Sequence, residues 1–192
     1  MAAILAISFV SFALIGRVII QYRTTGNHGI RLADPILDPV AALAGGTFVL
    51  SFAAGLAVVA LDFGAVWAVP RAGGAWFDGI ALFTGLSGVL IIVIAQLQMG
   101  SAWRIGVDRS EVTHLVTRGL YRRSRNPIYF GVGLYWVGLS ALMPHPIVWL
   151  AALLCWISIE VIVRKVEEPY LRALHGTEFA MYESASNRYR IW

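Results

Sequence analysis

Five apolar stretches, almost free of charged side chains, limit the folds that are open to this chain. They cover residues 3–20, 40–61, 79–99, 127–143 and 146–163. A helix needs about 17–25 apolar residues to cross a bilayer, and its backbone groups must be hydrogen-bonded within the protein. The first three stretches meet this length and the last two lie near its lower limit. The sequence therefore predicts an all-α, polytopic membrane bundle of about five transmembrane helices.

The composition supports a membrane protein and argues against a soluble domain. Charged residues make up only 14% of the chain, whereas soluble domains carry roughly 25%. The net charge of +4 comes mostly from arginines beside apolar segments, where topology and anionic lipids explain it better than nucleic acid does. The single cysteine, Cys155, lies inside an apolar stretch and is expected to be a packing residue. No cluster of His, Cys and Asp has metal-ligand spacing, so we predict no metal site.

The basic residues predict how the helices are oriented. With five spans, the segments that follow the first, third and fifth helices share one side of the membrane. Those segments hold most of the arginines, namely Arg23, Arg31, Arg104, Arg109, Arg118, Arg122, Arg123, Arg125, Arg164, Arg172, Arg188 and Arg190. The opposite side has only Arg71. Because basic segments stay in the cytoplasm, we expect the N-terminus outside and the C-terminus inside.

The chain is expected to have two parts. Residues 1–98 form three N-terminal spans, and residues 99–192 form a loop, a helical hairpin and a cytosolic tail. The turn at residues 143–146 is so short that the last two helices must be antiparallel. This hairpin would bring the polar residues 113–131 and 164–171 to one membrane face, with an interfacial helix and an ordered end after residue 169.

Smaller features predict how the helices pack and sit in the membrane. Ala53, Ala57 and Ala60 offer small side chains for close helix packing. Trp67, Trp76 and Phe77 flank a loop and are expected to be interfacial anchors.

Four charged residues fall on one face of the last helix and its extension. Glu160, Arg164, Glu167 and Glu168 are spaced i, i+4, i+7 and i+8. A structural ion pair with Arg164 would offset the cost of Glu160 inside an apolar run. Negative charge is disfavoured near a helix C-terminus, so Glu167 and Glu168 are either simply solvated or have a cationic partner in the arginine-rich loop or a ligand.

The opening of the fourth stretch contains residues typical of a helix start. Pro127 suits the first helical turn and leaves Asn126 as the N-cap. Free N–H groups at this point are also suited to an anionic ligand group. Gly131 allows close approach by either a ligand or another helix. These patterns predict a polar pocket at the cytosolic mouth of a bundle, but they do not identify a reaction.

Two motifs separated by the apolar hairpin carry a family resemblance. Residues 115–131 are L-V-T-R-G-L-Y-R-R-S-R-N-P-I-Y-F-G, and residues 167–182 are E-E-P-Y-L-R-A-L-H-G-T-E-F-A-M-Y. Together they resemble the integral membrane methyltransferases of the isoprenylcysteine carboxyl methyltransferase type, to which phospholipid N-methyltransferases are more distantly related. The resemblance covers about residues 96–192, and the N-terminal spans match only as apolar helices.

The resemblance implies S-adenosylmethionine as the cofactor and assigns roles to particular residues. The implied cofactor-binding residues are Leu115, Val116, Thr117, Gly119, Tyr121, Arg125, Asn126, Pro127, Tyr129, Glu167 and Glu168. The implied catalytic residues are Arg125, Arg164 and Glu167. Asn126 stands where the isoprenylcysteine enzymes have His, and because Asn cannot titrate near neutral pH, it is not expected to act as a general base.

The same resemblance implies a hydrophobic or lipid-like methyl acceptor that reaches the site from the bilayer. A carboxylate acceptor, as in isoprenylcysteine O-methylation, needs an orienting cation such as Arg164 or Arg125. An amine acceptor must lose a proton, for which a buried glutamate is the candidate. The residues do not decide between these acceptors, and the oligomeric state stays open.

Two other classes of function remain possible from the sequence. Sterol-type membrane reductases that use NADPH have a similar C-terminal arrangement of helices. A non-enzymatic transporter or assembly protein is the other alternative, although a transporter usually has polar residues at mid-membrane on several spans.

Overall fold

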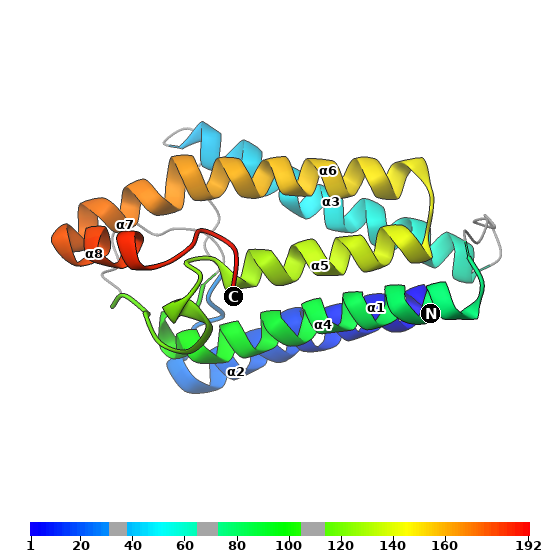
Figure 1. Cartoon of the computed structure of the whole chain (residues 1–192), viewed down its shortest axis with the longest axis horizontal. Coiled ribbons are helices and arrows are strands. Elements are labelled where there is room, and N and C mark those ends of the chain that lie inside the picture. Colours follow the sequence, from blue (N-terminus) through cyan, green and yellow to red (C-terminus); the bar gives the residue numbers. More distant parts are fainter. Residues whose placement is uncertain (31–37, 65–72, 105–113) are drawn as a thin grey trace.

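The computed structural model describes residues 1–30, 38–64, 73–104 and 114–192, and the fold is the predicted all-α bundle (Figure 1). The first span joins α1 (Ala2–Ser8), the π-helical η1 (Phe9–Gly16) and α2 (Arg17–Thr25). It is followed by α3 (Pro39–Phe63), α4 (Ala75–Met99), η2 (Gly100–Ala102), η3 (Gly119–Arg122) and α5 (Pro127–Leu142). The last part comprises α6 (Pro146–Val161), the π-helical η4 (Ile162–Glu167), α7 (Glu168–His175) and α8 (Thr177–Ala185).

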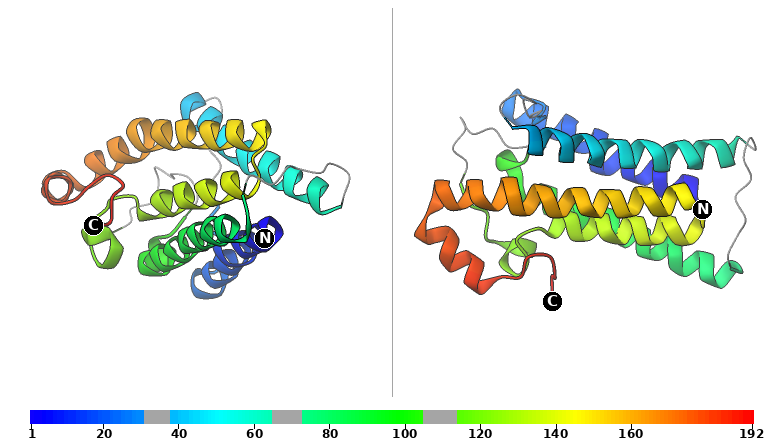
Figure 2. Two further views of the ribbon diagram at one scale, coloured as in Figure 1. Left: turned by 45° about the vertical axis from the view of Figure 1, so that its right-hand side comes forward. Right: turned by 90° about the horizontal axis from the view of Figure 1, so that it is seen from above.

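Four continuous helical stretches are long and apolar enough to cross a membrane, and α5 is a shorter fifth helix. The four are Ala2–Thr25, Pro39–Phe63, Ala75–Ala102 and Pro146–His175. With 16 residues, α5 is about 24 Å long, less than the roughly 30 Å hydrocarbon core. It lies between α4 on one side and the α3–α6 pair on the other, in all views (Figures 1 and 2). The short helix is thus an inner element of the bundle.

The last long helix extends further than the apolar run that predicts it. The apolar stretch ends at residue 163, but the helix continues without a break to His175. Pro169, in the first turn of α7, lacks an N–H and would crowd the carbonyl of the preceding turn. The helix widens into the π-helical η4 directly before it, which relieves that conflict. The extension carries Glu167 and Glu168 beyond the apolar part of the helix.

Glycines rather than the predicted alanines provide the closest helix contacts. Ala53, Ala57 and Ala60 are exposed, so the expected packing face of α3 was wrong. A Cβ atom on Gly55 would lie 2.8 Å from the Trp136 ring. On α5, a Cβ on Gly131 would lie 2.7 Å from the Gly88 carbonyl oxygen of α4. Gly131 therefore serves helix packing, which was one of its two expected roles.

Aromatic side chains hold the N-terminal spans against the central helix. Phe9 of the first span stacks on Phe52 of α3, with ring centroids 4.7 Å apart, and lies 4.6 Å from Tyr135 of α5. Phe52 also contacts Trp136 at 5.2 Å. Such pairs stabilise a core beyond their buried area. This cluster fixes α5, and with it the loop that precedes α5.

Candidate active site

The two motifs meet at one end of the bundle. The turn between α5 and α6 lies at the opposite end, and α7, α8 and the C-terminus gather near the start of α5 (Figure 1). Tyr129 Oη donates a hydrogen bond to Glu167 Oε1 over 2.7 Å. Arg125 Nε lies 3.4 Å from Glu168 Oε1. The hairpin thus brings the arginine-rich loop and the paired glutamates together, as the sequence predicts.

Glu168 is the buried centre of an ion-pair network. Its side chain is 5% exposed. Arg188 binds it with two parallel hydrogen bonds, Nε to Oε1 and Nη2 to Oε2, both 2.9 Å long. Arg125 adds a third contact, and Arg172 Nη2 lies 3.8 Å away. The hydrogen bonds to Glu168 raise the pKa of Arg188. The cationic partner that the sequence predicts for this glutamate is therefore three arginines.

Arg125 joins this network to the tail. Its Nη1 donates to the backbone carbonyls of Glu183, at 2.9 Å, and Ser186, at 2.7 Å. Arg172 binds the carboxylate of the same Glu183, with Nη2 to Oε1 at 2.7 Å. The Nη1 atom of Arg125 therefore holds the end of α8 and the residue after it against the loop.

Residues 187–192, which we call the C-terminal strap, lie along the loop before α5. The Arg125 N–H donates to the Asn187 carbonyl at 2.8 Å, and the Asn187 N–H donates to the Arg123 carbonyl at 2.8 Å. Further along, the ring of Tyr189 lies 5.2 Å from that of Trp156. This strap confirms the ordered end that the sequence predicts and brings Arg188 to Glu168.

Asn126 stands at the N-cap position of α5, but its side chain does not cap the helix. No capping hydrogen bond from this side chain is present. Its Nδ2 instead donates to the Arg188 carbonyl at 3.1 Å, beside the Asn126 backbone N–H, which donates to the same oxygen at 3.1 Å. The expected cap was wrong because the strap presents an acceptor to the side chain. Pro127 begins α5 as predicted and is buried.

Glu167 differs from Glu168 in its surroundings. It is largely buried and accepts a hydrogen bond from Tyr129. Tyr121 lies near by, and its hydroxyl group is buried without a hydrogen-bond partner among the described residues. Burial raises the pKa of Tyr121, Tyr182 and the carboxylate of Glu167 raise it further, and Arg17 lowers it. Tyr182 donates to the Tyr121 carbonyl at 2.7 Å, and burial raises the pKa of Tyr182 to about 12.

Arg164 lies outside the network around Glu168. It forms the predicted ion pair with Glu160, and its side chain is 54% exposed. The four charged residues of this helix therefore do not act as one continuous face. The π-helical η4 contains Arg164 and ends at Glu167, and its wider turn changes the angular spacing between Glu160 and the two glutamates.

The remaining predicted cofactor-binding residues lie at the start of η3 or shortly before it. Leu115 and Val116 are half-buried, whereas Thr117 and Gly119 are exposed. Gly119 has a φ of +63°, which favours glycine. The next N–H, that of Leu120, donates to Gln98 Oε1 of α4 at 2.7 Å. This bond fixes the loop to the bundle.

Sequence reasoning missed a polar layer that reaches from the first span to the site. Arg17 is 3% exposed and donates to Gln21 Oε1 at 2.7 Å and to the Gly100 carbonyl. Its guanidinium lies 4.6 Å from the centroid of the Trp103 ring. Gln96 of α4 donates to the Ala13 carbonyl at 2.9 Å. The available signal was an arginine inside an apolar run, which is rare in membrane helices and marks a site.

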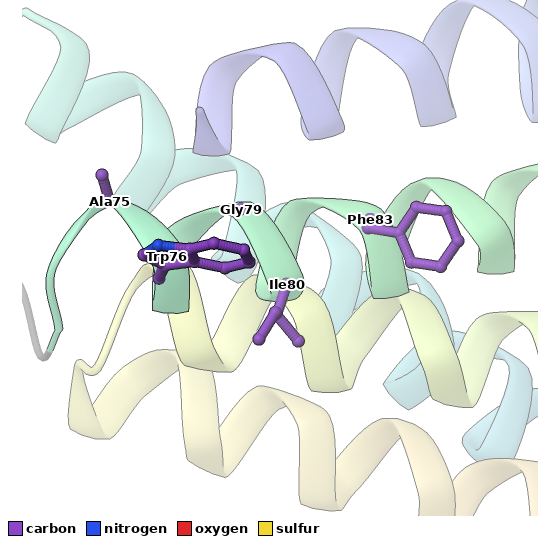
Figure 3. A pocket seen from close by; sticks show the side chains of 5 residues that line it. All are labelled: Ala75, Trp76, Gly79, Ile80 and Phe83. Carbon is purple, nitrogen blue, oxygen red and sulfur yellow. The ribbon is translucent and has the colours of Figure 1, made fainter.

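A hollow at the opposite end of the bundle is apolar rather than polar. It lies at the start of α4 and is lined by Ala75, Trp76, Gly79, Ile80 and Phe83 (Figure 3). Trp76 is 87% exposed there, and its role as an interfacial anchor stays a prediction. Trp67 lies outside the described residues. Within the described ranges, no group of three or more His, Cys, Asp or Glu side chains could hold a metal ion.

Comparison with known proteins agrees with the motifs. The family model for phospholipid methyltransferases matches residues 76–178, just over half of the chain. This range contains α4 except for its first residue, the loop, the hairpin and the paired glutamates. A search of curated proteins gave no match. The family includes the isoprenylcysteine-type membrane methyltransferases that the motifs resemble. The chain belongs to the phospholipid methyltransferase family of integral membrane proteins.

Proposed function

We propose that this protein is an S-adenosylmethionine-dependent methyltransferase that modifies a lipid-like acceptor at the cytoplasmic face of the membrane. The observation that carries this proposal is the meeting of the two family motifs, through Tyr129–Glu167 and Arg125–Glu168, at one end of the bundle. Family membership favours methyl transfer over the reductase and non-enzymatic alternatives.

The residues at this end suit S-adenosylmethionine, which supplies a methyl group bound to a positively charged sulfur. The Glu167 carboxylate complements a cation, and the buried Tyr121 hydroxyl has a free hydrogen-bonding position. We propose that Leu115, Val116, Thr117 and Gly119 border the cofactor, because they lie at the start of η3 or shortly before it, and η3 carries Tyr121.

Arg125, Asn126 and Glu168 each bind the strap in this structure, and Arg125 also contacts Glu168, so their proposed role is to shape the cofactor site. Pro127 and Tyr129, which lie in the first turn of α5, share this proposed role. A rigid site of this kind holds the reactants in line and excludes water, and this positioning supplies much of the rate of a displacement reaction.

An amine acceptor fits these surroundings better than a carboxylate does. A carboxylate would need an orienting cation, but Arg125 is engaged by Glu168 and two carbonyls, and Arg164 is paired with Glu160. An ammonium group must lose a proton before it can accept a methyl group. Glu167, which accepts a hydrogen bond from Tyr129, is the carboxylate we propose for that proton. Arg125 then acts as a positioning residue, and Arg164 contributes an ion pair with Glu160 outside the site.

The membrane orientation in this proposal follows the basic residues. The arginines of the loop before α5, of α7 and of the strap share the end that carries the paired glutamates. Because cytoplasmic segments are enriched in arginine and lysine, this end is placed in the cytoplasm and the N-terminus outside.

The test is transfer of an isotope-labelled methyl group from S-adenosylmethionine into membrane lipids by the purified protein. Wild type should label a lipid amine, and Glu167→Gln should lower the rate at least about 100-fold, a typical contribution of proton transfer. Glu178→Gln is the matched control, because Glu178 is 65% exposed and lies on α8. If a lipid ester is labelled in place of an amine, the amine assignment is rejected. If the protein neither binds the cofactor nor labels any product, the whole proposal is rejected.

A further inference from the structure

Arg17 is a buried cation whose hydrogen-bond partners in the described part of the chain are uncharged. It lies within the first span, is 3% exposed, and no carboxylate pairs with it among the residues that the structure describes. Its Nη2 binds Gln21 and the Gly100 carbonyl, but its Nε is buried without an acceptor. Burying a charge is costly unless it is paired and hydrogen-bonded, and an ionisable residue inside a membrane protein marks a functional site.

A second buried donor without a partner among the described residues lies at the same end of the bundle. Tyr121, which is 6% exposed, comes from η3, and its hydroxyl group is buried without a partner in the described part of the chain. Both residues are held at the end of α4, because Arg17 Nη2 donates to the Gly100 carbonyl and the N–H of Leu120, next to Tyr121, donates to Gln98 Oε1 at 2.7 Å. Two donors from distant parts of the sequence, one of them charged, therefore lie at the inner edge of the proposed active site.

We propose that Arg17 Nε and the Tyr121 hydroxyl together bind an anionic oxygen group, a carboxylate or a phosphate, of a ligand in the active site. The two donors need an acceptor, and a negatively charged one would also neutralise Arg17 through strong charge-assisted hydrogen bonds. This inference depends on the proposed function, which supplies two sources of such a group. One is the amino-acid carboxylate of S-adenosylmethionine, and the other is the phosphate of a phospholipid acceptor.

The local backbone supports a binding role for Arg17. The π-helical η1 ends at Gly16, directly before it, just as η4 ends at Glu167. Single π-helical turns inside α-helices occur frequently at functional sites. The first span thereby contributes to the site, although it lies outside residues 76–178 that match the family.

The experiment uses the full chain in lipid nanodiscs with two variants, Arg17→Gln and Tyr121→Phe. The matched control is Arg23→Gln, because Arg23 is exposed on the same helix α2. Binding of S-adenosylmethionine and of its decarboxylated analogue is measured by calorimetry. In a second arm without cofactor, dihexanoyl phosphatidylethanolamine and dihexanoylglycerol, which lacks the phosphate, are compared by the shift that each causes in Tm.

Each source of the anionic group predicts a different result. If Arg17 binds the cofactor carboxylate, Arg17→Gln should weaken S-adenosylmethionine at least about tenfold and leave the decarboxylated analogue unchanged. If it binds a lipid phosphate, both variants should lose the Tm shift caused by the phospholipid, and cofactor affinity should stay at the wild-type value. Arg23→Gln should behave as wild type in both arms. Tyr121→Phe removes one oxygen atom and carries the test if Arg17→Gln does not fold.

If Arg17 only ties α2 to the end of α4, the expected result differs from both of these. In that case Arg17→Gln would lower Tm, while both variants bound every ligand as wild type does, and the inference would be overturned. Loss of the phospholipid shift in variants of a protein that transfers no methyl group would support the anion site and reject the proposed function. Methyl transfer by wild type, together with equal ligand binding in all variants, would support the proposed function and reject the anion site.

Discussion

Glu168 and Arg17 are both buried and charged, yet their surroundings differ. Glu168 has a bidentate partner in Arg188 and a further hydrogen bond from Arg125. Arg17 has an amide and a carbonyl for partners, no carboxylate among the described residues, and an unsatisfied Nε. A buried charge whose hydrogen bonds and ion pairs are all formed can stabilise the fold. A buried charge that lacks a partner lowers the stability of the fold until a ligand supplies that partner.

The neighbouring glutamates show the same contrast within two residues. Glu168 is committed to the arginines that hold α8 and the strap, while Glu167 faces Tyr129 and the vicinity of Tyr121. We therefore assign Glu168 to structure and Glu167 and Arg17 to ligands. Substitutions can separate these roles, because structural residues change stability and ligand residues change binding.

The largest expected effect on stability is that of Glu168→Ala. Removing this carboxylate leaves Arg125, whose side chain is 10% exposed, and Arg188 without their shared partner. Breaking a buried pair in this way costs about 3–5 kcal/mol. Thermal unfolding in detergent should show a large fall in Tm, and a Tm within the error of wild type would show that Glu168 is not structural.

Arg188→Gln should have the next largest effect on stability. It removes the two 2.9 Å hydrogen bonds to Glu168 but leaves Arg125 as a partner, so we expect a loss of about 2 kcal/mol. Limited proteolysis of the strap should accelerate in this variant. Arg190→Gln is the control two residues away, since Arg190 is exposed.

The role of Asn126 can be tested by comparing the stabilities of two of its variants. At an ordinary N-cap, Asp is as good as Asn and Ala costs about 1 kcal/mol. Here the Asn126 amide donates to the Arg188 carbonyl, so a carboxylate would face that oxygen. We expect Asn126→Asp to be less stable than Asn126→Ala, by about 1 kcal/mol. The reverse order in chemical denaturation would restore the capping role.

The smallest effect should be that of Arg164→Gln. The Glu160–Arg164 pair is formed by an arginine that is 54% exposed, and exposed i, i+4 pairs contribute about 0.3–0.5 kcal/mol. Unfolding and methyl transfer should both stay close to wild type. A loss of activity of tenfold or more would return Arg164 to the catalytic residues that the family resemblance implies.

Local patterns in the sequence predicted the parts of the fold that depend on local physics. Uncharged apolar runs identified the spans, the turn at residues 143–146 identified the hairpin, and i, i+4 spacing identified the Glu160–Arg164 pair. The ordered end was expected, but its pairing with the loop before α5 could not be predicted, because Asn187 pairs through its backbone with Arg123 and Arg125, some sixty positions away. The small residues of α3 were chosen wrongly because close packing depends on which helix face meets a neighbour, as Gly88 and Gly131 show.

Within the site, sequence reasoning identified the right region but not the division of roles. The motifs located Tyr129, Glu167 and Glu168 together, but only the structure separates the engaged Glu168 from Glu167. Arg17 was passed over because the first span resembles no motif, although a charge in an apolar run is itself informative.

Equilibrium binding of S-adenosylmethionine to the purified protein and three variants tests the assignment of roles most directly. We predict saturable binding to wild type, at least about tenfold weaker binding to Glu167→Gln, and unchanged binding to Arg164→Gln and Glu178→Gln. Equal affinity in all four proteins, or no binding to wild type, would contradict the assignment of Glu167 to a ligand.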